Sequence, residues 1–122
     1  MDVGALHQQR MSVSMEEKNM ECEYRIHGPE LCTVLPRELD HHVASGIRQE
    51  ADLLVETYHI RRIIFDFCMT EFMDSSGIGV ILGRYRSMKL SGGQIWAVNV
   101  KPRTEKILAM SGLESIITAE RI

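Results

Sequence analysis

The segment from Arg61 to Val100, RRIIFDFCMTEFMDSSGIGVILGRYRSMKLSGGQIWAVNV, decides the fold. It opens with RRIIFDF, an apolar run typical of a strand inside a sheet, and it closes with a second strand-like run, QIWAVNV. The glycines of LSGG suit a left-handed helix end. Between the runs, spacings of three or four mark one helical stripe from Ser75 onward: Ile78, Ile81, Leu82, Tyr85 and Met88. A strand, helix, strand order needs a crossover connection and predicts parallel neighbours.

Three elements are expected ahead of this segment. Strand-like runs at Glu21–Ile26 and Leu31–Leu35 flank the turn signal of HGPE. Pro36 has no amide hydrogen, so it suits a strand end or a sheet edge. Asp40 is typical of a helix N-cap. The helix after it carries an apolar stripe that we expect to cover a sheet: Val43, Ile47, Ala51, Leu54 and Tyr58.

The C-terminal part predicts one more helix and one more strand. Pro102 suits a first helical position, the helix runs to Met110, and Gly112 closes it. ESIITAE then reads as a last strand. The expected order is β-β-α-β-α-β-α-β, an α/β domain over residues 21–122 with a small mixed, largely parallel sheet covered by helices. Residues 1–20 have few large apolar side chains and are expected to form a flexible tail.

Composition and charge argue against several classes of function. The chain has 122 residues, enough for one domain, and its net charge of −3 provides no basic field for nucleic acid. It has no run of about 18 apolar residues and no signal-like apolar segment, so we expect a cytoplasmic protein without a membrane span. The three cysteines form no C-x-x-C motif. The neighbours His41 and His42 diverge on a helix, so no metal site is expected.

The stretch FMDSSGIGV, Phe72 to Val80, carries the candidate chemistry. A serine nucleophile elbow needs G-x-S-x-G, which neither Ser75 nor Ser76 satisfies, so we do not expect an enzyme of that class. A small nucleotide-binding domain using the turn at Gly77, Gly79 and Gly83 remains an alternative, because glycines open a helix after a strand. Against it, the loop is long, no acidic residue ends the next strand, and no Walker lysine is present.

A third interpretation makes Ser75 a phosphate acceptor. A hydroxyl in the first turn of a helix is exposed, and phosphorylation adds roughly −1.5 to −2 charges beside Asp74. That change repels a partner surface without unfolding the helix. The residues alone equally favour a simple helix N-cap at Asp74 or Ser75, with the glycines only permitting close packing.

Longer stretches go beyond these patterns. The run from Phe72 to Leu113, the motif ELDHHVA at Glu38–Ala44 and the motif MSGL near the end together resemble the anti-sigma factor antagonists of the STAS domain family. The likeness is to the sporulation type of sporulating Gram-positive bacteria and covers about Glu21 to Glu120. It implies a small mixed sheet covered by helices.

The resemblance also implies a mechanism. The unphosphorylated protein binds an anti-sigma factor that is also an ATP-dependent serine kinase, and so frees a sigma factor. Phosphorylation on Ser75 abolishes binding, and a serine phosphatase restores it. The chain itself needs no cofactor, since ATP belongs to the kinase, and we expect a monomer.

The expected partner-binding residues lie around Ser75. We expect Glu38, Asp40 and His41 on a loop that faces the Ser75 helix, Met73 as an apolar contact, and a close-contact surface at Asp74, Ser76, Gly77 and Gly79. One departure is Pro36-Arg37, which stands where the family usually has a glycine. Arg37 is expected to reach the phosphoserine or to alter which kinase docks.

Overall fold

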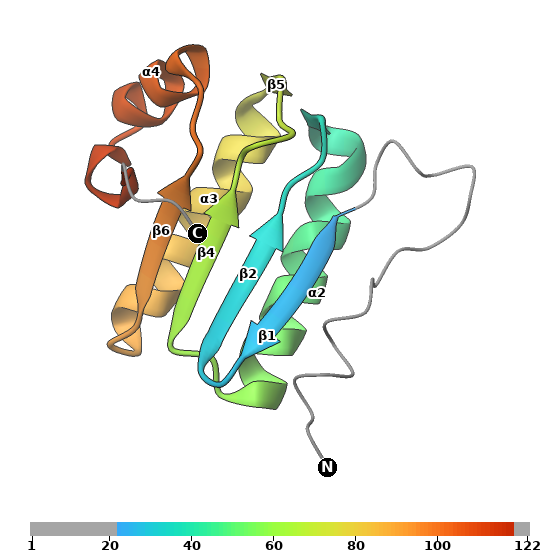
Figure 1. Ribbon diagram of the computed structural model, residues 1–122, viewed down its shortest axis with the longest axis vertical. Helices are drawn as coiled ribbons and strands as arrows, with labels where there is room; N and C mark the ends of the chain where they lie inside the picture. Colours follow the sequence, from blue (N-terminus) through green and yellow to red (C-terminus); the bar gives the residue numbers. More distant parts are fainter. Residues whose placement is uncertain (1–21, 119–122) are drawn as a thin grey trace.

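The computed structural model describes residues 22–118, so the tail predicted for residues 1–20 lies outside the described part. Figure 1 shows the arrangement. The elements are β1 (Glu23–His27), β2 (Glu30–Val34), β3 (Glu38–Leu39), α2 (His41–Tyr58), β4 (Arg62–Asp66), β5 (Phe72–Met73), α3 (Ser75–Leu90), β6 (Gln94–Val98), α4 (Pro102–Met110) and the 3₁₀ helix η2 (Glu114–Ile116). No helix among these residues is long and apolar enough to cross a membrane.

The main sheet is mixed and largely parallel, as predicted. Its strand order is β1-β2-β4-β6, with β1 antiparallel to β2 and the other pairs parallel. Leu31, Ile63 and Ile95 lie in register across the three parallel strands. The helices α2 and α3 lie on the same face of this sheet, behind it in Figure 1. The long crossovers that parallel pairing requires therefore place both helices in one layer.

The core lies between that helical layer and the sheet. The stripe predicted for α2 is confirmed at Val43, Ile47, Ala51 and Leu54, which are buried, whereas Tyr58 is only partly buried. The stripe predicted for α3 is partly wrong, because Ile78, Leu82 and Tyr85 are only partly buried. The face that α3 buries holds Gly77, Val80, Ile81, Arg84 and Met88. This face is turned because Gly77 packs against β3 and Arg84 pairs with α2, neither of which an apolar period can reveal.

The strand predicted at ESIITAE is wrong over its described residues. Glu114–Ile116 form a 3₁₀ helix, followed by a single parallel bridge between Ile117 and Ala97. Leu113 and Ile116 are both buried. Because a 3₁₀ helix has three residues per turn, the spacing of three brings these two side chains to one side.

Two very short strands were not predicted. Strands β3 and β5 pair in parallel, with Glu38 opposite Phe72 and Leu39 opposite Met73. Leu39 and Met73 are buried, whereas Glu38 and Phe72 are exposed, as expected when successive side chains alternate between faces. Each strand runs into the N-terminus of a helix, β3 into α2 and β5 into α3. This pairing holds the two helix starts side by side.

Candidate functional site

The N-terminus of α3 presents Ser75. Asp74 is the N-cap, and its Oδ1 accepts hydrogen bonds from the backbone amides of Ser76 at 2.8 Å and Gly77 at 3.2 Å. Ser75 is therefore the first helical residue, and its side chain is exposed. Of the two residues considered as the N-cap, Asp74 is the cap, so the Ser75 hydroxyl does not cap the helix.

The N-terminus of α2 adjoins this point. Asp40 caps α2 and accepts a hydrogen bond from the His42 amide at 3.0 Å, as predicted. The next residue, His41, reaches across, with its Nδ1 3.8 Å from Asp74 Oδ2. The Asp74 amide in turn donates to the carbonyl of Leu39 at 3.3 Å. The structure thus brings Glu38, Asp40 and His41 to the start of the Ser75 helix, as the resemblance implied, but Glu38 lies in β3 and His41 begins α2, so they do not form a loop.

The Asp74 carboxylate is held in its ionised form. Partial desolvation raises its pKa, but the hydrogen bonds from the Gly77 and Ser76 amides and the proximity of His41 outweigh this, and the net pKa is lowered from 3.8. A negative charge therefore lies next to the Ser75 hydroxyl at neutral pH.

The glycines of this stretch do not form a phosphate-binding turn. Gly77, Gly79 and Gly83 all lie within α3, and the amides of Ser76 and Gly77 are already used by Asp74. Gly77 serves packing, because a Cβ there would lie 2.5 Å from the carbonyl oxygen of Leu39 and 2.8 Å from Met73 Cγ. Gly79 is exposed and faces open space. The nucleotide-binding turn considered as an alternative does not fit this geometry.

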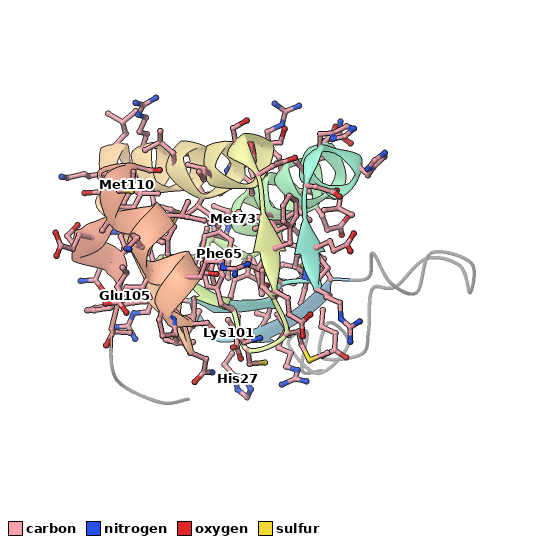
Figure 2. The ribbon with its side chains drawn as sticks, turned by 90° about the horizontal axis from the view of Figure 1, so that it is seen from above. His27, Phe65, Met73, Lys101, Glu105 and Met110 are labelled. Atoms are coloured by element: carbon pink, nitrogen blue, oxygen red, sulfur yellow. The ribbon has the colours of Figure 1, made fainter. Side chains whose placement is uncertain are left out.

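Met73 requires a correction. Its side chain is only 6% exposed and belongs to the core, so it is not the surface contact that was predicted. Figure 2 looks down on this end of the molecule and labels Met73. Its neighbour Phe72 is 52% exposed instead. In a two-residue strand only the pairing with β3 decides which side chain faces out, and two residues are too few to show a periodic pattern that predicts this pairing.

Arg37 lies in the loop just before β3 and contacts the loop before β5. Its carbonyl accepts hydrogen bonds from the amides of Glu71 at 2.8 Å and Phe72 at 3.1 Å, which continue the β3–β5 pairing. Its Nε lies 3.9 Å from Glu71 Oε1, and both side chains are exposed. Arg37 therefore takes part in the backbone pairing of this loop and forms an ion pair on its surface.

Residues 19–122 match the family described as STAS domain. The chain belongs to the STAS domain family. It is similar to an anti-sigma F factor antagonist of Paenibacillus polymyxa, with 36% identity over 99 residues that cover 81% of this chain and 85% of that protein. That relative is named as a regulator and not as an enzyme, which agrees with the prediction that this STAS domain is not an enzyme.

Solved structures agree with this STAS assignment. The anti-sigma factor antagonist SpoIIAA in its unphosphorylated form superposes with a TM-score of 0.76 at 29% identity, over 82% of this chain and 88% of that one. The Bacillus cell fate determinant SpoIIAA in the phosphorylated form gives a TM-score of 0.72 at 29% identity, over 82% and 91%. The predicted fold class is confirmed.

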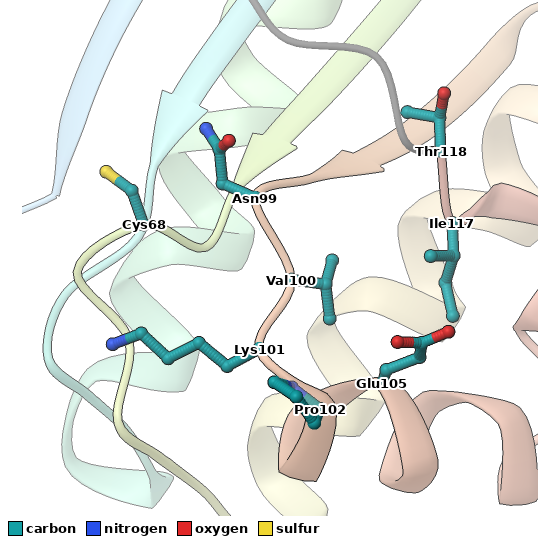
Figure 3. A pocket seen from close by; sticks show the side chains of 8 residues that line it. All are labelled: Cys68, Asn99, Val100, Lys101, Pro102, Glu105, Ile117 and Thr118. Atoms are coloured by element: carbon teal, nitrogen blue, oxygen red, sulfur yellow. The ribbon is translucent and has the colours of Figure 1, made fainter.

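The STAS domain also has a cavity away from Ser75. It measures about 730 Å³ and lies between the loop that follows β4, the connection from β6 to α4, and the residues after η2 (Figure 3). Its lining contains none of the three glycines and consists of Cys68, Asn99, Val100, Lys101, Pro102, Glu105, Ile117 and Thr118. Residues 22–118 contain no group of three side chains suited to hold a metal ion. This cavity therefore does not include Ser75, whose side chain is exposed at the start of α3.

Proposed function

We propose that this STAS domain is an anti-sigma factor antagonist controlled by phosphorylation of Ser75. The observation that carries the proposal is the exposed Ser75 hydroxyl directly after the Asp74 cap. The similarity to a named anti-sigma F factor antagonist supports the class of partner. The similarity to SpoIIAA, solved with and without phosphate, supports control by phosphorylation.

In the proposed cycle the unphosphorylated chain binds an anti-sigma factor with serine kinase activity and frees the sigma factor. The kinase transfers the γ-phosphoryl group of ATP to Ser75 Oγ, releasing ADP and the hydroxyl proton. A serine phosphatase later hydrolyses the phosphoserine to serine and inorganic phosphate. ATP is used by the partner, and this chain acts as a cytoplasmic monomer without a cofactor of its own.

Electrostatics explains why the phosphorylated form releases its partner. Phosphate adds roughly −1.5 to −2 charges at Ser75, beside the ionised Asp74. The amides of Ser76 and Gly77, which in an uncapped helix would stabilise an anion, are bonded to Asp74. The new charge is therefore poorly compensated within the chain, and a partner that covers it must remove its water.

Of the residues around Ser75, some are exposed and are proposed to contact the partner, and others hold the local structure. Glu38, His41 and Gly79 are exposed, and Ser76 is partly exposed, so they are proposed partner contacts. Gly79 has open space where a side chain would be, which lets a partner backbone approach closely. Three residues act from behind this surface: Asp40 and Asp74 as caps, and Gly77 as the packing point against Leu39.

Binding of serine variants to the purified anti-sigma F factor of the same organism tests the proposal. Ser75→Ala should bind like the wild type and stay bound when ATP is added. Ser75→Asp adds about one charge and should bind more weakly. Ser87→Asp is the matched control, because Ser87 is also exposed on α3 but lies about 18 Å further along it. Wild-type affinity for Ser75→Asp would contradict electrostatic release.

A further inference from the structure

The loop between β4 and α3 is held firmly against the segment before β3. The hydroxyl of Thr70, a fully buried residue, donates to the carbonyl of Pro36 at 2.9 Å. The amides of Glu71 and Phe72 both donate to the carbonyl of Arg37. The side chains that this loop exposes are therefore presented by an ordered backbone.

Phe72 is one of two large apolar side chains that this loop exposes. It is 52% exposed, while Leu39 and Met73, the adjacent pair on β3 and β5, are almost fully buried. Phe72 stands opposite Glu38, two residues before the Asp74 cap and three before Ser75. Met69, from the same loop, is 55% exposed. Aromatic side chains on ordered backbone are favoured anchors at protein interfaces, because little conformational entropy is lost when they are buried.

We infer that Phe72, supported by Met69, is the apolar anchor that the anti-sigma partner buries when it binds the Ser75 surface. The inference rests on the proposed function and names the feature that recognises the partner. It replaces the contact predicted for Met73, whose side chain faces the core.

The charges around Phe72 indicate the chemistry of the partner surface. Glu38 stands opposite Phe72 in the β3–β5 pairing, Glu71 directly precedes Phe72, and Arg37 is paired with Glu71. Acidic groups thus predominate at this rim. The matching partner surface is an apolar recess bordered by basic side chains, since complementary charge at a rim speeds association and orients the complex.

Position, and not exposure alone, distinguishes Phe72. Leu90 and Met110 are more exposed, at 91% and 81%, but single exposed apolar residues are normal on a protein surface. Leu90 ends α3, about 22 Å from Ser75 along the helix axis, and Met110 ends α4. These two residues are therefore matched controls.

The anchor and the phosphate acceptor lie on one surface, with a consequence for phosphorylation. Phe72 is only three residues before Ser75, so a kinase bound at Ser75 also contacts the surface around Phe72. Loss of the ring should therefore raise the KM for phosphorylation of this chain and change kcat much less, because the ring takes no part in phosphoryl transfer.

The test measures the dissociation constants of wild type, Phe72→Ser, Phe72→Leu, Leu90→Ser and Met110→Ser for the purified anti-sigma F factor of the same organism. Phe72→Ser should bind about tenfold more weakly or worse. Phe72→Leu should recover most of the affinity, and both controls should stay within about twofold of wild type. Urea unfolding checks that all variants remain folded.

The salt dependence of binding distinguishes the apolar contribution of Phe72 from the electrostatic contribution of the charged residues around it. Raising the salt from about 50 to 500 mM should weaken wild-type binding through the acidic rim, but the ratio between Phe72→Ser and wild type should not change. Normal binding by Phe72→Ser, or equal losses in Leu90→Ser, would overturn the anchor and leave the proposed function standing. Failure of the wild type to bind would overturn both.

Discussion

His41 Nδ1 lies 3.8 Å from Asp74 Oδ2, and this contact joins the starts of the two helices that cover the sheet. The two residues are 33 positions apart in the chain but become neighbours because β3 and β5 pair just before them. The Asp74 carboxylate thus makes two kinds of contact: it caps α3, and it lies close to His41 at the start of α2. Any change at Ser75 occurs beside this junction.

The Asp74 cap predicts a pH dependence of stability. Because the folded state lowers the pKa of Asp74 below 3.8, its contribution is complete above that value and is lost as pH falls through the lowered pKa. Asp74→Ala should therefore lower the urea midpoint more at pH 6 than at pH 3. Asp74→Asn keeps a capping oxygen without the charge, so its midpoint should stay near that of wild type at pH 6. A wild-type acid response in Asp74→Ala would contradict the assignment.

Gly77 and Gly79 should respond oppositely to the same substitution. Gly77→Ala places a methyl group against the Leu39 carbonyl and Met73, and should lower the free energy of unfolding by about 2 kcal/mol. Gly79→Ala meets nothing within 4 Å and should raise it by about 0.5–1 kcal/mol, since alanine is the better helix former. Urea unfolding measures both. Equal effects would mean that the β3–α3 contact is not close.

Two threonines provide a second matched pair. The hydroxyl of Thr33 is buried with no hydrogen-bond partner among residues 22–118, so Thr33→Val should stabilise the chain by about 1 kcal/mol. The Thr70 hydroxyl bonds the Pro36 carbonyl, so Thr70→Val should destabilise it by about 1–2 kcal/mol. Thermal unfolding should show the two melting temperatures moving in opposite directions. A lower melting temperature for Thr33→Val would show that its hydroxyl has a partner.

Arg84 gives a test of the α2–α3 contact. Its Nε lies 2.9 Å from Asp52 Oδ1, and Arg84 is largely buried while Asp52 is half exposed. Burial lowers the pKa of Arg84 and the Asp52 charge opposes this, which indicates a poorly solvated cation. Asp52→Asn should destabilise the chain by about 1–2 kcal/mol after allowance for the exposed partner. Arg84→Met should be neutral or stabilising in urea unfolding, and a large loss would contradict this view.

Much of the fold was predictable because the long elements carry strong periodic patterns. The helix after Asp40, the helix after Asp74 and the strands between them have the predicted order, and both aspartates are caps. Features that depend on long-range contacts were missed. The pairing of Glu38–Leu39 with Phe72–Met73 joins two-residue strands, which are too short to show any period. The outward direction of Phe72 follows from that pairing.

The other errors have the same origin. Arg84 was not expected on a buried face because its side chain is charged, and only the proximity of Asp52 on another helix allows it. The C-terminal apolar residues suited a strand by composition. A spacing of three between Leu113 and Ile116 instead matched a 3₁₀ turn against the core.

The most direct test of the account is the site of phosphorylation. Wild type, Ser75→Ala and Ser76→Ala are incubated with the anti-sigma F factor of the same organism and ATP, and the phosphate is mapped by mass spectrometry. We expect one phosphate on Ser75 in wild type and in Ser76→Ala, and none in Ser75→Ala. A phosphate on another residue, or one that persists in Ser75→Ala, would contradict the assignment of Ser75 as the acceptor. So would the absence of any phosphate on the wild type when the same kinase preparation phosphorylates another antagonist in a control reaction.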